Sequence, residues 1–456
     1  MQEILFGYKL NPTTWAYISA LMMLGIYFKF HRFWSVRNLD LAALIAFSPG
    51  LLLIYYGLVR QWPELMKAWG MTTAAGSPPA DLAKHLIEAG YVWLFAVGVV
   101  FLVRLLLDPM MVRRPLLEPN LSAGGLTFTG LAMLVFLMAN VITCPPERLE
   151  YLLAKQAKQE ATPATPDPGY PLFDKFSNFA DQAMIPVAQL PPATRHEVLL
   201  QTAAAHALTI LAHLAVVAGM VWIGFRHFDN IQTGVAAATL YLLSFYTSQM
   251  TARVDYVAPA MLLIWAIAAY RRPLISGILI GVVGGLIFYP LFLLPLWCAF
   301  YWRRGMVRFG FGVVAALVVL VASLAFLAPD VATFAAQTRQ MFGVRNPLDV
   351  KLVGFWQFYD PAYRIPVMTL FAAICGGLAF WPAQKNLGTL LSCSAAVMLA
   401  TQFWHAHQGG LCMGWYLPLL ILTIFRPNLE DRVALSAVRP AWGRRRQPSS
   451  NAARTA

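Results

Sequence analysis

Apolar blocks close to 20 residues long recur along almost the whole chain, and this feature constrains the fold most. About 20 apolar residues in a helix cross the ~30 Å hydrocarbon layer of a membrane. Hydrophobic residues make up 59% of the chain and charged residues only 12%, too few to coat soluble domains of this total length. The pattern predicts an all-α, polytopic transmembrane helix bundle of about 10–13 spans and excludes a soluble enzyme.

The apolar blocks define the expected spans. These lie near residues 13–30, 40–59, 90–107, 123–143, 203–224, 231–249, 256–270, 273–301, 309–328, 366–382, 387–404 and 411–425. The block 273–301 is too long for one simple crossing and contains Gly284, Gly285 and Pro290. We therefore expect a helix, a break and a returning helix there, since neighbouring helices or a wet cavity can satisfy the freed backbone groups.

Basic residues concentrate in alternate loops. One side of the expected topology receives Lys29–Arg37, Arg104–Arg114, Arg226, Arg271–Arg272, Arg303–Arg308, Lys385 and the tail from Arg426. Because cytoplasmic loops carry an excess of Lys and Arg, this bias predicts an outer N-terminus and a cytoplasmic C-terminus. We interpret the net charge of +13 as this topology signal, with no nucleic-acid partner. A multi-pass protein of the bacterial cytoplasmic (inner) membrane, its first span an uncleaved anchor, is the expected setting.

The chain divides into six expected regions. They are N-terminal transmembrane helices in 1–143, a large outer (periplasmic) loop in 144–198, a central transmembrane module in 199–328 with the broken helix 273–301, a second outer loop in 329–365, C-terminal transmembrane helices in 366–426, and a basic, disordered cytoplasmic tail in 427–456. The first loop holds a Pro-rich stretch and an amphipathic piece, Phe173–Val187. The second begins with an expected surface helix near Val331–Met341. Loops this long are usually functional or disordered.

Ionisable residues are nearly absent from the span interiors and gather at the outer boundary instead, which argues against an ion-coupled transporter. Arg253 and Asp255 occupy a short outer turn, where they could bind a lipid phosphate and a sugar hydroxyl. The alternative is a solvated turn with a local ion pair. Asp167, Asp174 and Asp181 lie in the first outer loop, and one of them could be the general base that takes a proton from an acceptor hydroxyl. Solvated loop carboxylates are the alternative.

Two further groups stand at the outer boundary. His405 and His407 could contact a phosphate or simply cap the end of a span, and two imidazoles alone do not make a metal site. Trp356 and Tyr359 could stack on sugar rings, although aromatic residues more commonly anchor a protein at headgroup level. The five cysteines form no CxxC and no Cys/His cluster, so neither a metal centre nor a disulfide framework is expected.

The segment 253–305 carries a recognisable order of elements. Arg253-Val-Asp255-Tyr256 opens a span that ends in Arg271-Arg272, followed by a glycine-rich span, the break at Pro290 and Arg303-Arg-Gly305. This order resembles polyprenol-phosphate-sugar-dependent glycosyltransferases of the C superfamily (GT-C), most closely the mannosyltransferase-like family 87. Arg253-Val-Asp255 stands where that family has Gln-Val-Asn, and Ile287 where it has a lysine.

The resemblance implies a function and roles. The chain would transfer a hexose such as mannose from a polyprenyl-phosphate sugar to a lipid, glycan or protein acceptor at the outer membrane face. Asp174 or Asp181, ahead of Asp167, would be the catalytic base. Arg253, His405 and His407 would contact the phosphate, and Asp255 would position or assist. No cofactor is certain, a divalent metal is compatible, and membrane lipids and the lipid-linked sugar are the expected partners.

Three alternatives stay open. An O-antigen-ligase-like or other polysaccharide-assembly enzyme would also combine about a dozen spans with a large outer loop, and Arg195-His196 suits its use of arginine and histidine. A transporter or lipid flippase would have a central cavity continuous to both faces. A non-catalytic scaffold is the third, favoured by Ile287 and by the absence of the family's first-loop Asp-Phe-x-x-Tyr-like element, for which residues 174–181 are a candidate.

Overall fold

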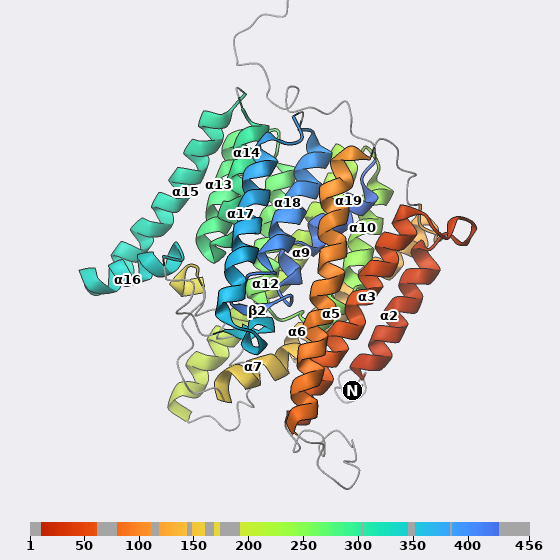
Figure 1. The fold of residues 1–456 in the computed structure, drawn as a ribbon, viewed down its shortest axis with the longest axis horizontal. Helices are drawn as coiled ribbons and strands as arrows, with labels where there is room; N and C mark the ends of the chain where they lie inside the picture. Colours follow the sequence, from red (N-terminus) through yellow and green to blue (C-terminus); the bar gives the residue numbers. More distant parts are fainter. Residues whose placement is uncertain are drawn as a thin grey trace, which may run out of the picture.

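The computed structural model describes residues 11–61, 80–111, 118–143, 148–159, 168–173, 192–302, 304–344, 352–383 and 385–427. Within these residues the chain is a helical bundle (Figure 1). The first half contains α2 (Pro12–Tyr27), α3 (Val36–Gln61), α5 (Ala80–Leu107), α6 (Ala123–Thr143), α7 (Leu149–Gln159), α9 (Pro192–His227), α10 (Ile231–Leu243), α11 (Phe245–Gln249) and α12 (Val254–Ala268). The second half contains α13 (Pro273–Ile287), α14 (Leu294–Phe300), α15 (Met306–Leu327), α16 (Val331–Met341), α17 (Arg364–Phe380), α18 (Leu387–Thr401) and α19 (Leu417–Phe425).

Six of the described helical segments are long and apolar enough to cross a membrane. They are Val36–Gln61, Asp81–Met110, Ala123–Thr143, Leu200–His227, Met306–Leu327 and Pro361–Phe380. Shorter apolar helices, such as α12 and α18, pack among them and are more completely buried. A helix buried on every side needs no polar face, which explains their uniformly apolar sequences. The expected all-α membrane bundle is therefore present at this level of detail.

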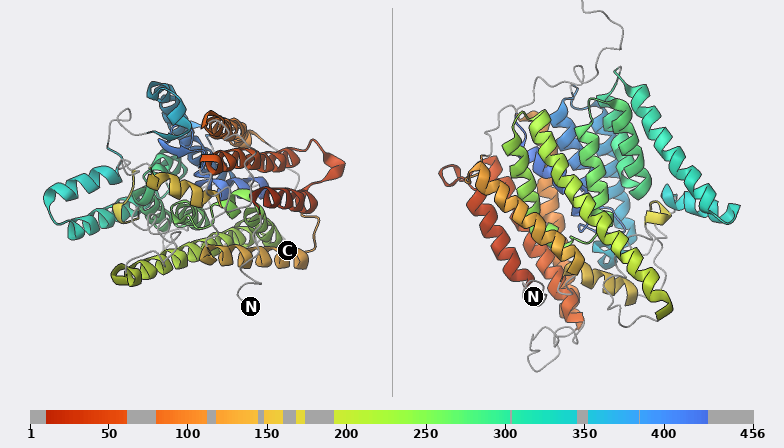
Figure 2. Two further views of the ribbon diagram at one scale, coloured as in Figure 1. Left: turned by 90° about the horizontal axis from the view of Figure 1, so that it is seen from below. Right: turned by 180° about the vertical axis from the view of Figure 1, so that it is seen from behind.

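Several expected boundaries shift. Helix α9 begins at Pro192, so the boundary drawn at residue 198 falls inside a helix that extends diagonally along the back of the bundle (Figure 2). The expected span 231–249 is two helices, since Ser244 adopts an extended conformation and caps α11 by accepting a hydrogen bond from the Thr247 N–H. In the expected span 411–425, only Leu417–Phe425 is α-helical. The expected surface helix is confirmed as α16, Val331–Met341.

The break within 273–301 is confirmed. Helix α13 ends at Ile287, Phe288 takes a positive φ of 59°, and a 3-10 turn over Tyr289–Leu293 leads into α14. The chain then returns toward the start of α13. The Tyr301 hydroxyl, just after α14, donates a hydrogen bond at 2.6 Å to the carbonyl of Tyr270, which precedes α13. Residues 273–301 are thus a helical hairpin whose tip lies inside the bundle.

Glycine permits the tightest helix contact near this hairpin. Side chains added at Gly277 and Gly312 would lie 2.2 Å and 2.4 Å from the carbonyl oxygens of Phe309 and Leu274. Backbones can approach this closely only where no Cβ intervenes, as in many membrane helix pairs. Helices α13 and α15 therefore pack as one parallel unit.

The expected basic loops meet at one end of the bundle. Arg104, near the end of α5, pairs with Asp40 in α3, and Arg426, after α19, pairs with Asp108. The Lys29 ammonium donates to the Asn120 side chain at 2.9 Å. We call this the basic end. Tail residues from 428 onward lie outside the described residues.

Two short strands lie near the opposite end of the bundle. Val353–Gly354 (β1) pairs in parallel with His407–Gly409 (β2), and the Val353 N–H donates to the Ala406 carbonyl at 2.9 Å. This pairing connects the second outer loop to the segment between α18 and α19. Both belong to the surroundings of the candidate site.

Candidate functional site

Arg253 and Asp255 form the local ion pair that the sequence left open. The guanidinium donates from Nη2 and Nε to the two carboxylate oxygens at 2.7 Å and 3.0 Å. Arg253 also lies over the Tyr256 ring, 4.8 Å from its centroid. Since Asp255 binds one edge of the guanidinium through both of its oxygens, much of the charge on Arg253 is compensated.

The carboxylate of Glu150, which was not a sequence candidate, stabilises the turn that precedes Arg253. Glu150, in α7, is 1% exposed and accepts hydrogen bonds from the Ala252 N–H at 2.8 Å and from Arg148 at 3.1 Å. Burial raises the pKa of Glu150, and the neighbouring Arg148 opposes that rise. Its position shortly after the span 123–143 was the only signal, because the turn that it binds through Ala252 lies about a hundred residues away in the chain.

A buried histidine fixes the same turn from within the bundle. His213 in α9 lies 3.0 Å from the Thr251 carbonyl through Nε2 and 3.0 Å from the Tyr241 hydroxyl through Nδ1. A carbonyl oxygen only accepts, so Nε2 carries the proton and Nδ1 accepts from Tyr241. Residues 249–253 are thus held by groups from three helices.

His405 and His407 differ in exposure, since His405 is buried and His407 is partly exposed and lines a cavity. His405 is 1% exposed and packs against the rings of Tyr289 and Trp415, with centroids 4.7 Å and 5.5 Å apart. Its Nδ1 accepts the His407 N–H at 3.2 Å. Across the described residues no group of three or more His, Cys, Asp or Glu side chains is arranged to hold a metal ion. The pair supplies imidazoles to the site from an irregular loop and a strand.

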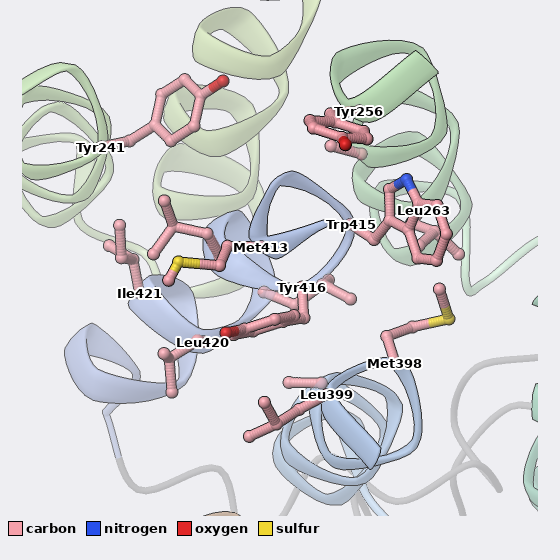
Figure 3. Close-up of a cluster of buried hydrophobic side chains, with 14 of the residues drawn as sticks. Tyr241, Tyr256, Leu263, Met398, Leu399, Met413, Trp415, Tyr416, Leu420 and Ile421 are labelled. Carbon is pink, nitrogen blue, oxygen red and sulfur yellow. The ribbon is translucent and has the colours of Figure 1, made fainter. Parts of the chain in front are cut away.

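Trp415 connects the two halves of the candidate site. Its indole N–H donates to the Asp255 carbonyl at 3.0 Å, and its ring stacks on Tyr289 with centroids 5.3 Å apart. Figure 3 shows the segment that carries Trp415 packed between Tyr256 and Leu263 on one side and Met398 and Leu399 on the other. Trp415 thus connects the backbone of Asp255 with the ring of His405.

A cavity of about 210 Å³ lies beside Trp415 and His405; most of its wall is apolar, and we call it the polar pocket because Arg364 and His407 line it. Arg364, His407, Trp404 and Tyr289 contribute to its walls. Arg364 is only 3% exposed, and its guanidinium donates to the Trp404 carbonyl at 2.9 Å and 3.2 Å. The indole nitrogen of Trp404 is buried and has no acceptor among the described residues. The pocket therefore presents hydrogen-bond donors and a buried cation.

Arg364 was not a sequence candidate. It is the first residue of α17, and nothing in the sequence separates it from other loop arginines. Its burial comes from contacts with a segment 40 residues away in the chain. Only the packing of α17 against residues 404–407 identifies it.

A larger cavity of about 740 Å³ lies between α5 and α17, and we call it the lateral groove. Its walls are almost wholly apolar and include Trp356, Tyr359, Phe371 and Phe403. The Trp356 indole donates to the Phe403 carbonyl at 3.0 Å, and the Tyr359 hydroxyl to Glu88 at 3.3 Å. The two predicted aromatic residues thus line a groove rather than a polar pocket.

The groove and the polar pocket are neighbours. Phe371 in the groove and Trp404 in the pocket contact each other with ring centroids 5.4 Å apart. Helix α17 supplies residues to both cavities. An elongated amphiphile could therefore place an apolar chain in one and a polar head near the other.

The three candidate bases, Asp167, Asp174 and Asp181, lie outside the described residues, and so do the side chains of Arg195 and His196. The short described segment 168–173 lies against the hairpin tip. The Tyr170 N–H donates to the Leu286 carbonyl at 3.0 Å, and Pro168 lines the polar pocket. The first outer loop therefore reaches the site.

Comparison with known proteins adds no relative to this picture. No protein-family model matches the chain, and no curated protein or solved structure matches it.

Proposed function

We propose that the chain is an integral membrane glycosyltransferase of the GT-C type that uses a polyprenyl-phosphate sugar. It would transfer a hexose such as mannose to a lipid, glycan or protein acceptor. The observation that carries this proposal is the polar pocket with its buried guanidinium beside an apolar groove between two candidate spans. A lipid-linked sugar phosphate needs both environments at once.

Arg364, His407 and the Trp404 indole N–H suit the donor phosphate. Charge-assisted hydrogen bonds from a guanidinium to phosphate oxygens are stronger and shorter than neutral ones. A site shielded from water strengthens them further. We assign the main phosphate contact to Arg364 rather than to Arg253, because Asp255 already forms a bidentate ion pair with the Arg253 guanidinium.

The lateral groove suits the polyprenyl chain. Its aromatic and aliphatic walls lie between α5 and α17, both counted among the candidate spans, so an isoprenoid could enter it from the lipid. Trp356 and Tyr359 would contact the chain near its phosphate end. Their expected stacking on a sugar ring is thus replaced, in this proposal, by contact with lipid.

The transfer needs one carboxylate. The acceptor hydroxyl oxygen attacks the anomeric carbon, and the bond from that carbon to the phosphate oxygen breaks. The lipid phosphate keeps the electron pair, while a carboxylate removes the hydroxyl proton. Asp167 directly precedes Pro168, and Asp174 directly follows Phe173, so both adjoin the segment that reaches the pocket. Asp181 remains the third candidate.

The distribution of charge supports the orientation. The positive-inside rule puts the basic end in the cytoplasm. The polar pocket would then open toward the outer face of a bacterial inner membrane. Transfer would take place there, with the N-terminus on the same side and the tail in the cytoplasm.

The direct experiment is a transfer assay with the purified protein. We expect it to transfer a labelled sugar from at least one member of a small panel of polyprenyl-phosphate sugars. The double substitution Asp174→Asn with Asp181→Asn should abolish transfer without loss of folded protein. Asp330→Asn, at the exposed N-cap of α16 where the Asn oxygen can still accept the cap hydrogen bond, is the matched control and should retain transfer. Full activity in the double variant would remove both aspartates from the mechanism.

A further inference from the structure

A second cavity, of about 590 Å³, lies at the basic end of the bundle, and we call it the basic pocket. Its walls come from the loop between α2 and α3, the start of α3 and the ends of α5 and α19. Six residues carry the argument that follows, namely Arg32, Trp34, Val36, Arg37, Arg104 and Ile424. None of them belongs to the candidate transfer site.

A buried amide fixes the loop that forms one wall. Asn38 is 1% exposed, and its side-chain nitrogen donates to the carbonyls of Lys29 at 2.9 Å and Arg32 at 3.0 Å. Its side-chain oxygen accepts the Lys29 N–H at 3.2 Å. The loop is therefore held in place by the protein itself, which lowers the entropy lost when a ligand binds.

The charges around the pocket favour an anion. Asp40 and Asp108 bind Arg104, and Asp108 also binds Arg426, so these two acids meet two arginines. Arg32 and Arg37 also line the pocket, so the arginines around it outnumber these two acids. The amino end of α3 begins at Val36 and adds the partial positive charge of a helix N-terminus.

Exposed aromatic residues mark the depth of the pocket in a membrane. Trp34 is 80% exposed and Phe30 75% exposed, and both belong to the loop that forms the wall. Phe33 contacts the Trp34 ring edge to face, with centroids 5.5 Å apart. Trp side chains concentrate at the level of lipid headgroups. The arginines beside them would therefore stand at the level of lipid phosphates.

We propose that the basic pocket binds one acidic glycerophospholipid, with the headgroup phosphate at Arg32 and Arg37. One acyl chain would lie against Val36 and Ile424, which form apolar parts of the wall. Basic pockets between helices at the cytoplasmic side are a known means of holding anionic lipids. This binding is independent of sugar transfer, and either can fail while the other holds.

The test is native mass spectrometry of the delipidated full-length protein. We expect phosphatidylglycerol to be retained more strongly than phosphatidylcholine. Arg32→Gln should weaken retention about fivefold, the effect of removing one basic residue near an anionic headgroup. Arg272→Gln is the matched control, because Arg272 is an exposed arginine in the basic loop between α12 and α13 but does not line the pocket. It should leave retention unchanged.

Arg37→Gln should weaken retention at least as much, and tryptophan fluorescence checks that it folds. If that variant unfolds, Arg32→Gln still decides. Equal retention of the two lipids, or equal weakening by Arg32→Gln and Arg272→Gln, would overturn the proposal. Displacement of the lipid by an equal concentration of sn-glycerol 3-phosphate would also overturn it, since the occupant would then be a free phosphate ester.

Discussion

The two ends of the bundle use buried arginine in different ways. At the basic end, Arg104 and Arg426 bind the carboxylates of Asp40 and Asp108, and Asp108 is fully buried. At the opposite end, Arg364 is as deeply buried, but it donates to a main-chain carbonyl and lines a cavity. The first arrangement holds neighbouring helices together. The second keeps a cation beside space that a ligand can occupy.

This difference distinguishes arginines that stabilise the fold from an arginine that lines a possible binding site. A carboxylate surrounded by arginines on neighbouring helices has its partners already, so it contributes to assembly. The Arg364 guanidinium lines a cavity together with Trp404 and His407, where a substrate could contact it. Disrupting the arginine pairs at the basic end should therefore lower stability, whereas replacing Arg364 should lower activity.

The largest expected effect is loss of stability at the basic end. Asp108→Asn should lower the free energy of unfolding by about 3–5 kcal/mol, because it removes the buried carboxylate that binds Arg426 and one of the two that bind Arg104. Unfolding of the detergent-solubilised protein would measure it. Asp81→Asn, at an exposed position at the start of α5, should change little. Equal stability of the two variants would show that the ion pairs of Asp108 do not stabilise the bundle.

The next effect is on activity at the opposite end. Arg364→Ala should lower the rate of sugar transfer about 100- to 1000-fold, the usual result of removing one donor to developing negative charge. Arg339→Ala, on the exposed face of α16, is the control and should retain the wild-type rate. Rates would be measured on protein whose unfolding midpoint is checked. An unchanged rate for Arg364→Ala would show that the donor phosphate does not bind in the polar pocket.

A smaller effect concerns pH and the support of the Arg253 turn. Burial raises the pKa of Glu150 even though Arg148 and Arg253 oppose it, so the native protein holds this proton more tightly than the unfolded chain. The stability that the protonated Glu150 gives the folded protein is greatest at low pH, and it is lost as the pH rises from about 4.5 through the raised pKa. Glu150→Gln should have a flatter pH profile of stability. Parallel profiles for the two proteins would contradict this.

The smallest expected effect is at the rim of the lateral groove. Tyr359→Phe removes the hydrogen bond to Glu88 but keeps the apolar ring, so it should cost at most about 1 kcal/mol of stability. The apparent affinity for a polyprenyl-phosphate donor should not change in a binding titration. A large loss of donor affinity would show that the hydroxyl, and not the ring, contacts the ligand.

Local patterns predicted the elements that depend only on local sequence. The break after Ile287 and the surface helix Val331–Met341 both occur where the sequence indicated. Trp415 links the turn of Arg253 and Asp255 to His405, and the roles of these residues stay predictions. The apolar residues 411–416 are a loop and a short turn, because their contacts with Tyr246 and Asp255 compete with continuous helix.

What the sequence by itself determined is a helical, membrane-type bundle with its basic loops grouped together. Block length, hydropathy and charge spacing are properties of contiguous residues, so they can be read directly from the chain. The importance of Arg364, Glu150 and the two cavities was decided only by the tertiary structure. Arg364 contacts a segment 40 residues away, Glu150 one about 100 residues away, and the cavities lie between segments more than 200 residues apart. No local pattern encodes which apolar helix packs against which.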